Sequence, residues 1–406
     1  MTEIYRGTYV TLSTLKKMTN AARDITPFLL VCLIAFTVFF SSYLRIPVMP
    51  LFAATLGAGP VQVGTINGAF MLTVALLSMP AGLLADRTGR NVPIVLGVAA
   101  TAVSSLLVTL CTQPEQMVAA YIIFGVGLAA FAPAMLSLVA DVIPSNLLGQ
   151  AYGWYTTAIY IAMTLGPALG GYLAKVLGLR QVFLVSGGLL TAVTLLALLI
   201  LPKGPPRHTT VLTLSLANSF SLLRIRSLLA CLLATLASCI GFGVFLTFLP
   251  LYASQHGFDS AQVGLLFAAQ AITNVVGRVP IGRLADRSER RWLVAVGLIF
   301  LASALIALGQ VVLFSHLIIC AVVMGVGMAL TFTAIGALIA ELTPAMQRGL
   351  AMGMYNSCIY LGMMFGSTVM GITLKQIGYP LGFALAGSTS VLAMVLFLWM
   401  MQEKKR

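Results

Sequence analysis

Charged side chains are scarce in this chain. Lys, Arg, Asp and Glu make up 8% of its 406 residues, whereas a soluble domain carries about 25%. Hydrophobic residues account for 60%, and the mean hydropathy is +1.03. This composition excludes a soluble globular protein and indicates an integral membrane protein.

Cysteine is also scarce, and its placement excludes a metal site of known spacing. The six cysteines fall in or beside apolar segments without the spacing of metal ligands. No paired nucleophile and base stands out either. We therefore expect no metal, no cofactor and no enzymatic activity.

Long apolar segments make up most of the sequence. A helix needs roughly 20 apolar residues to cross a bilayer, and charged residues separate twelve such stretches. They are 27–52, 62–84, 92–112, 117–142, 149–175, 182–201, 227–251, 261–284, 292–313, 317–342, 349–374 and 380–401. The sequence thus predicts an all-α integral membrane protein with 12 transmembrane helices in two pseudo-symmetric six-helix bundles.

The predicted organisation has five parts. These are an N-terminal tail (1–26), a first bundle (27–201), a linker (202–226), a second bundle (227–401) and a C-terminal tail (402–406). The N-terminal tail lacks a short apolar region followed by a cleavage site, so we expect no cleavable signal peptide.

Basic residues outnumber acidic ones by 23 to 10, which gives a net charge of +13. Most lie in the tails, in the linker and in the loops at 87–90 and 283–291. Short loops rich in Lys and Arg stay in the cytoplasm, so both termini are predicted to be cytoplasmic in a multi-pass protein of the cell (plasma/inner) membrane. The same scatter argues against nucleic acid as a partner.

The sequence contains an internal repeat at an offset of 200 residues. Residues 80–90 (PAGLLADRTGR) return as residues 280–290 (PIGRLADRSER), and Gln62-Val63-Gly64 returns as Gln262-Val263-Gly264. A register kept over this length indicates a tandem duplication.

These features resemble the major facilitator superfamily of secondary transporters. Its signature loop is matched by Gly82, Asp86, Arg87, Gly89 and Arg90, and in the second half by Gly282, Asp286, Arg287 and Arg290, with Glu289 in place of the second glycine. The resemblance implies two bundles around a midplane cavity that opens alternately to each side. It also implies that Asp86 faces the start of the eleventh span and Asp286 the start of the fifth.

The arginines of these loops need acidic partners. Asp141 is the candidate for Arg87 or Arg90, and Glu341, 200 residues later, is the candidate for Arg287 or Arg290. The alternative is that these arginines only snorkel to the membrane surface and set the topology.

The fifth span carries a second signature. Gly153, Ala162, Gly166, Pro167, Gly170 and Gly171 resemble the antiporter motif of drug and metabolite exporters in this superfamily, with Ala162 where a glycine is usual. Small residues allow close helix packing, and Pro167 permits a bend. The alternative is generic small-residue packing without any meaning for the direction of transport.

Acidic residues are missing from the middle of every span. Proton-coupled relatives often place a carboxylate there and an arginine in the fourth span, where this sequence has Tyr121. Protons remain one candidate coupling ion without an obvious carrier.

The polar residues inside the spans are therefore candidates for substrate binding. Two stripes with a spacing of four end in arginine, and aromatic and amide side chains of three other spans add to them. The candidates are Thr37, Ser41, Arg45, Tyr121, Tyr155, Gln270, Asn274, Arg278, Tyr355 and Asn356. Helix packing or snorkelling is the alternative for both arginines.

The leading hypothesis is a transporter that exports small amphipathic organic compounds. The alternative is a transporter of organic anions such as monocarboxylates, in which the two arginines hold the substrate. Expected partners are a small-molecule substrate and the lipid bilayer, and we expect a monomer. The duplicated loops argue against a channel or a receptor.

Overall fold

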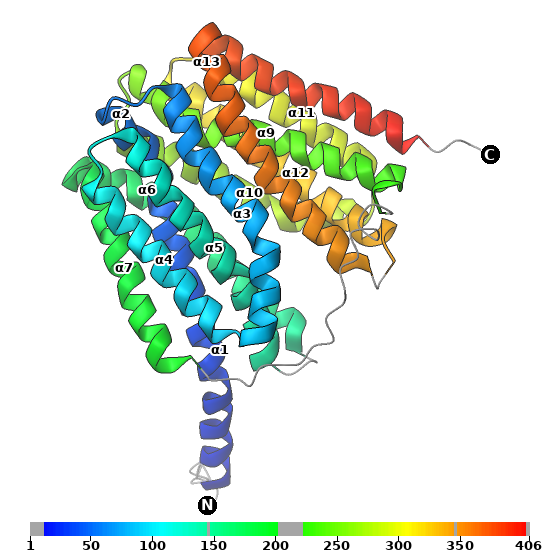
Figure 1. The fold of residues 1–406 in the computed structure, drawn as a ribbon. Coiled ribbons are helices and arrows are strands. Elements are labelled where there is room, and N and C mark those ends of the chain that lie inside the picture. The colour runs from blue at the N-terminus through cyan, green and yellow to red at the C-terminus, as the bar shows by residue number, and fades with distance from the viewer. Residues whose placement is uncertain (1–11, 144–146, 202–221, 345–346, 403–406) are drawn as a thin grey trace, which may run out of the picture.

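The computed structural model describes residues 12–143, 147–201, 222–344 and 347–402, and the regular secondary structure in these ranges is helical. The first half contains α1 (Leu12–Leu44), α2 (Val48–Thr55), α3 (Pro60–Thr88), α4 (Asn91–Leu110), α5 (Pro114–Val142), α6 (Leu148–Leu177) and α7 (Leu179–Ile200). The second contains α9 (Arg226–Gln255), α10 (Ser260–Ala285), α11 (Arg290–Leu308), α12 (Phe314–Leu342) and α13 (Arg348–Met401) (Figure 1).

The described residues form eleven helical segments that are long and apolar enough to cross a membrane. Many large apolar side chains point outward, among them Leu110 at 74% and Leu199 at 84% exposure. In a bilayer such side chains contact lipid, and the hydrogen bonds within each helix satisfy the backbone.

The first predicted span differs from what the structure shows. The stretch 27–52 is not one helix, because α1 ends at Leu44 and α2 begins at Val48. Pro47 has no N–H to continue α1, and the Arg45 carbonyl accepts bonds from the N–H groups of Val48 and Met49 at 3.1 and 2.8 Å. This break places Arg45 at a bend.

The stretches 349–374 and 380–401 are joined in α13. Its chain direction changes at Gly378, whose φ of +77° interrupts the helical backbone. Glycine adopts such a positive φ at little cost.

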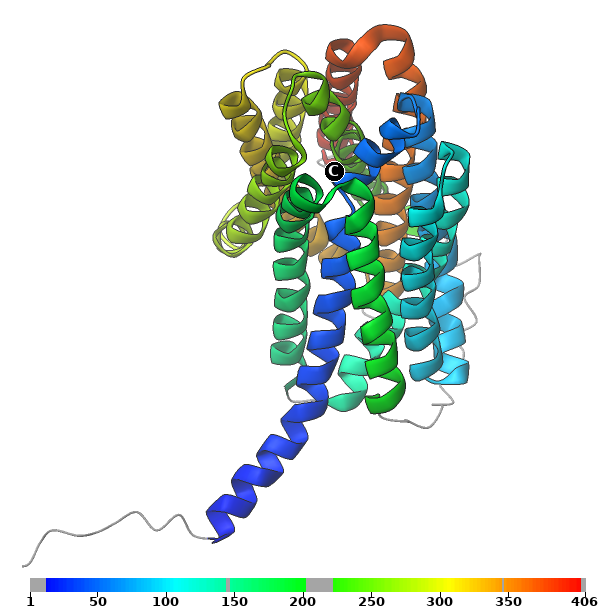
Figure 2. The same ribbon diagram turned by 90° about the vertical axis from the view of Figure 1, so that its left-hand side faces the viewer.

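The predicted tail and linker lie partly outside the described residues. Helix α1 begins at Leu12, inside the predicted N-terminal tail, and projects well beyond the other helices (Figures 1 and 2). Residues 202–221 of the predicted linker are outside the described ranges, and α9 begins at Arg226.

Two helix pairs make the most extensive contacts between the halves of the chain. Helix α3 packs on α13, and α6 packs on α10. Glycines make both approaches close: a Cβ at Gly64 would collide with the carbonyl of Ser367, and a Cβ at Gly171 with that of Ser260. Small residues let helix backbones approach each other in this way.

Candidate functional site

The two ends of the helix bundle differ in composition. We call the end with Arg87–Arg90, Asp141, Arg287–Arg291 and Glu341 the arginine end. The other end, with α2, Lys175 and Asp259, is called the opposite end.

The halves are in contact at the opposite end. Lys175 on α6 forms an ion pair of 2.8 Å with Asp259, which caps α10. The Ser260 hydroxyl donates to the Gly171 carbonyl at 2.9 Å. Deeper inside, the Asn67 amide donates to the Thr247 hydroxyl at 2.9 Å.

The same helix pairs are separated at the arginine end. Helices α6 and α10 meet at Gly171 and Gly264, yet a Cβ at Gly153 or Gly282 would meet no described atom within 4 Å. On α13, Gly353 is equally open. The site between the halves is thus closed at the opposite end and open toward the arginine end.

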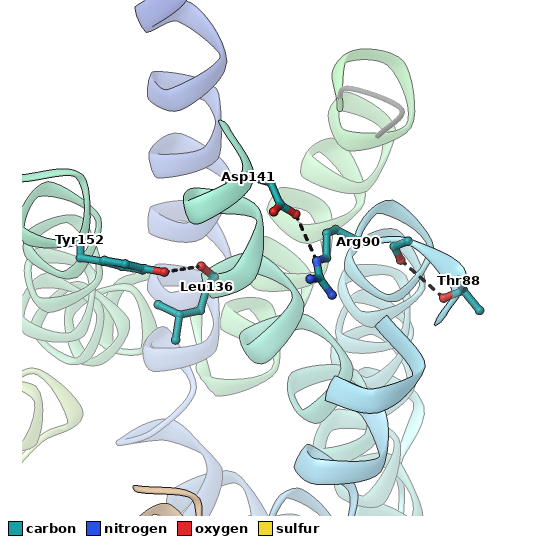
Figure 3. A network of polar contacts seen from close by, with 6 residues as sticks. Thr88, Arg90, Leu136, Asp141 and Tyr152 are labelled. Atoms are coloured by element: carbon teal, nitrogen blue, oxygen red, sulfur yellow. Dashed lines mark hydrogen bonds and ion pairs between the residues drawn. The ribbon is translucent and has the colours of Figure 1, made fainter. Parts of the chain in front are cut away.

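The signature loops form ion pairs within each half. Arg90 Nε lies 3.2 Å from Asp141 Oδ2 (Figure 3), and Arg290 pairs with Glu341. Gly89 has a φ of +86°, in the range that glycine favours. Arg87 and Arg287 are exposed.

Asp286 does not reach the other half in this state. Asp286 is 77% exposed and lies 3.8 Å from Arg290 in its own loop rather than at the start of α6. The side chain of Asp86, predicted to face the start of α13 near Gly349, lies outside the described residues. Gly82 has only ordinary contact, 3.8 Å from its Cβ position to Pro133, and Gly282 faces open space.

A cavity of about 530 Å³ lies between the halves. Ten aromatic side chains and five methionines line it, drawn from both halves. Methionine adapts to varied shapes, and aromatic rings offer large apolar faces. Among the lining residues, Arg45 and Arg278 are the charged ones.

Half of the predicted substrate residues line this cavity. They are Arg45, Tyr121, Arg278, Tyr355 and Asn356. The remaining five, Thr37, Ser41, Tyr155, Gln270 and Asn274, are not among its lining residues.

These five have other surroundings. Thr37 donates to the Leu33 carbonyl, while Ser41 and Tyr155 are buried. Gln270 donates to the Met328 sulfur at 3.1 Å, and Asn274 accepts from Arg278 Nε at 3.1 Å. Gln270 and Asn274 thus do not line the cavity themselves but form hydrogen bonds with the lining residues Met328 and Arg278.

Arg278 connects the halves. Its guanidinium lies 4.4 Å from the centre of the Tyr160 ring on α6, and its Nη1 donates to the Tyr160 hydroxyl. With Nε bonded to Asn274, protein groups use two of its three nitrogens.

Arg45 is buried in the first half, with 1% of its surface exposed. Its guanidinium lies 3.7 Å from the centre of the Phe124 ring and 5.8 Å from that of Tyr121. Nη1 donates to the Ser105 hydroxyl at 3.0 Å. Nε and Nη2 have no hydrogen-bond partner among the described residues.

The small residues of α6 have two packing partners. Gly166 and Gly170 pack on Tyr43 and Leu44 of α1, directly before Arg45. Gly171 packs on α10, and Ala162 is fully buried. Pro167 lies inside α6 with its carbonyl 2.5 Å from the Cβ position of Gly264.

Several lining residues were not predicted from the sequence, chiefly Tyr43, Asn67, Phe70 and Phe124. Two of them could have been suspected because they differ from their counterparts in the internal repeat. Phe70 and Phe124 correspond to Gln270 and Met324 in the second half. Other lining residues keep the repeat, as Ile159 with Ile359 and Tyr160 with Tyr360, so departures from it indicate only part of the lining.

Comparisons with known proteins agree with this architecture. The family model described as Major Facilitator Superfamily matches residues 31–261 and 231–406. Multidrug resistance protein 2 of Bacillus subtilis (strain 168) is 26% identical over 404 residues, covering 96% of this chain and 98% of the relative. An uncharacterized MFS-type transporter of Methanocaldococcus jannaschii is 26% identical, covering 82% and 87%.

Solved structures share the fold. The nucleoside transporter NupG has a TM-score of 0.77 at 15% identity and covers 93% of this chain and 100% of its own. A bacterial homolog of the human lysosomal transporter Spinster, in an inward-facing and occupied conformation, has a TM-score of 0.76 at 17% identity, covering 92% and 96%.

Proposed function

The chain belongs to the Major Facilitator Superfamily, and from this premise we propose that it is a secondary active transporter that exports small amphipathic organic compounds by alternating access. The observation that carries the proposal is the cavity of about 530 Å³, lined from both halves by aromatic and methionine side chains. Its closure at one end and opening at the other fit one state of such a cycle.

The proposed topology has twelve spans in two six-helix bundles. Helix α13 would supply two spans, one on each side of Gly378. The basic arginine end would face the cytoplasm with both termini, at the plasma membrane. The state with the arginine end open would then be inward-facing, ready to take up a substrate from the cytoplasm.

Two observations support export as the direction. The fifth-span motif from Gly153 to Gly171 resembles that of exporters, and Gly166, Gly170 and Gly171 lie at the contacts of α6 with α1 and α10. Relatives from Bacillus subtilis are named multidrug resistance proteins. Protons remain the candidate coupling ion, and the protein would work as a monomer.

A second candidate function is the transport of organic anions such as monocarboxylates. The observation that favours it is the charge of the lining, in which Arg45 and Arg278 are the charged residues. A buried arginine without an acidic partner stabilises a negatively charged ligand.

Transport into proteoliposomes of purified protein tests both functions. A cationic dye and an aromatic monocarboxylate of similar size are compared, with and without a pH gradient, against protein-free liposomes. Accumulation of either compound above the control supports a transporter, and dependence on the gradient supports proton coupling. Equal signals with and without protein would contradict the proposal.

A further inference from the structure

Only one of the three guanidinium nitrogens of Arg45 has a hydrogen-bond partner among the described residues. Its Nη1 bonds to Ser105, whose hydroxyl also contacts that of Ser186 at 3.0 Å, and the Ser186 hydroxyl donates to the Ser41 carbonyl at 2.9 Å. These contacts link α1, α4 and α7 behind the cavity. They fix the guanidinium by one nitrogen.

The two remaining nitrogens form one edge of the guanidinium. Nε–H and Nη2–H point in parallel and make the fork that fits a carboxylate with two hydrogen bonds. Both are buried and unpartnered among the described residues. Because buried donors of a charged group are unfavourable without an acceptor, this edge is suited to a ligand that brings one.

The free edge is turned away from Ser105. In a planar guanidinium the Nε–Nη2 edge faces away from Nη1, and Ser105 is not among the residues that line the cavity, whereas Arg45 is. Phe124 and Tyr121, over whose rings the cation lies, line the cavity too. Phe70 stacks on Phe124 with ring centres 4.4 Å apart.

The second half does not repeat this arrangement. The positions of Arg45, Phe70 and Tyr121 hold Phe245, Gln270 and Ala321 there. The ion pairs at the arginine end do recur, as Arg90–Asp141 and Arg290–Glu341 show. The arginine and its rings are therefore specific to one side of the cavity.

Arg278 differs from Arg45 in this respect. Its Nε already donates to Asn274 and its Nη1 to Tyr160, so its parallel fork is not free. Its contact with Tyr160 also spans the two halves, whereas every contact given for Arg45 lies within the first half.

We propose that the Nε–Nη2 edge of Arg45, whose guanidinium lies over Phe124, is the binding subsite for the carboxylate of an amphipathic aromatic anion. The carboxylate would accept two hydrogen bonds from Arg45, and the ring system would lie among the aromatic and methionine side chains of the cavity. This inference rests on the proposed function, because it names the substrate class of the same cavity. Both nitrogens are covered in this state, so the ligand displaces a neighbouring side chain as it binds.

Calorimetric titration of the purified full-length protein tests the subsite. Three probes share one ring system and differ in the head group: 2-naphthoate, 2-naphthylmethanol and 2-naphthylmethylammonium. We expect naphthoate to bind about tenfold tighter than the alcohol, since charge-assisted bidentate bonds are roughly twice as strong as neutral ones. The cation should bind most weakly.

Substitutions of single arginines by lysine test which arginine causes the preference for naphthoate over the alcohol. Arg45→Lys keeps a cation but loses the fork, so it should reduce naphthoate affinity about tenfold and the preference over the alcohol with it. Arg278→Lys should reduce it less. Arg180→Lys is the matched control, because Arg180 also lies near an aromatic ring, 5.7 Å from the centre of Phe52, but outside the cavity lining, and its naphthoate affinity should equal that of the wild type.

Several results would overturn the inference. They are equal wild-type affinities for naphthoate and the alcohol, or a larger loss in Arg278→Lys than in Arg45→Lys. If Arg45→Lys does not fold, Ser105→Ala replaces it: it removes the anchor of Nη1 and should lower the naphthoate preference severalfold, and an unchanged preference would contradict the subsite. Binding without transport in proteoliposomes would refute the exporter and leave the anion subsite standing.

Discussion

Two arginines give the cavity its charge, and their neighbours assign them different tasks. Arg278 holds Asn274 and Tyr160, so it joins α10 to α6. Arg45 is anchored to Ser105 and keeps one edge free. Residue type and spacing alone do not distinguish these cases, because the difference lies in contacts between helices that are distant in the sequence.

A third basic residue, Lys175, closes the opposite end of the cavity. Its hydrogen bond to Asp259 lowers the pKa of that carboxyl group below its usual range, aided by the bond from the Gln262 N–H. A carboxylate with a lowered pKa stabilises the closed end at every pH above its unpaired pKa. The contribution is lost as the pH falls through the lowered value.

We therefore predict that the closed end is insensitive to pH between about pH 8 and about pH 5, since an unpaired Asp titrates near 3.9. The labelling rate of a cysteine placed at the cavity residue Ile359, in a background without native cysteines, is divided at each pH by the rate of free cysteine with the same reagent, because thiolate reactivity itself rises with pH. This ratio should stay constant from the side of the opposite end over this range. Asp259→Asn should raise labelling at every pH, because asparagine still caps α10 but carries no charge. Labelling that already rises at pH 6 in the wild type would show that another group controls this end.

At the scale of helices, α6 determines the position of Arg45. Gly166 and Gly170 let α6 approach α1 at Tyr43 and Leu44, and α1 ends there. The exporter-like motif thus has a packing role within its own half, besides the contact of Gly171 with the other half.

Gly170→Leu should force α6 away from α1, because a Cβ there would collide with the Leu44 carbonyl. Overpacking of this kind costs about 1–3 kcal/mol, and we expect a lower Tm together with transport reduced about tenfold. Gly188→Leu on the exposed side of α7, where a Cβ meets no described atom within 4 Å, is the control that should change neither. Wild-type Tm and transport in Gly170→Leu would exclude this packing role.

Most helices could be predicted because hydropathy and the repeat define them independently. The break after α1 was missed, although the repeat contained a signal for it. Pro47 corresponds to Thr247, and α9 runs from Arg226 to Gln255 without a break at that position. Helical spacing predicts that Gln270 and Asn274 line the cavity together with Arg278. Of the three, only Arg278 is among the lining residues, because residues four apart drift around the helix and only part of its surface reaches the cavity.

At the scale of the whole molecule, the most extensive contacts between the two halves are those of α3 with α13 and of α6 with α10. In this one, α6 and α10 touch at Gly171 and Gly264 and are apart at Gly153 and Gly282. Alternation between two open sides requires the reverse arrangement, in which Asp286 would approach the start of α6. A charge at a helix N-terminus is worth up to about 2 kcal/mol in a partly buried site, which is enough to shift such an equilibrium.

The same substitution at two positions of α6 should therefore have opposite effects. Gly171→Leu would place a side chain against Ser260 and the Gly264 backbone, so it should hold the opposite end open. Gly153→Leu meets open space in this state, but it should obstruct closure of the arginine end. Overpacking of about 1–3 kcal/mol corresponds to a shift of severalfold or more between the two states.

Labelling of the cysteine at position 359 from each side of the membrane measures this shift, with a reagent that does not cross the bilayer. Gly153→Leu should raise labelling from the side of the arginine end and lower it from the side of the opposite end, and Gly171→Leu should do the reverse. Gly188→Leu should leave both rates at their wild-type values, because the control residue lies at neither contact. If both α6 variants shifted labelling in the same direction, the halves would not alternate about these contacts, and α6 would be a fixed wall of the cavity instead of one of its moving gates.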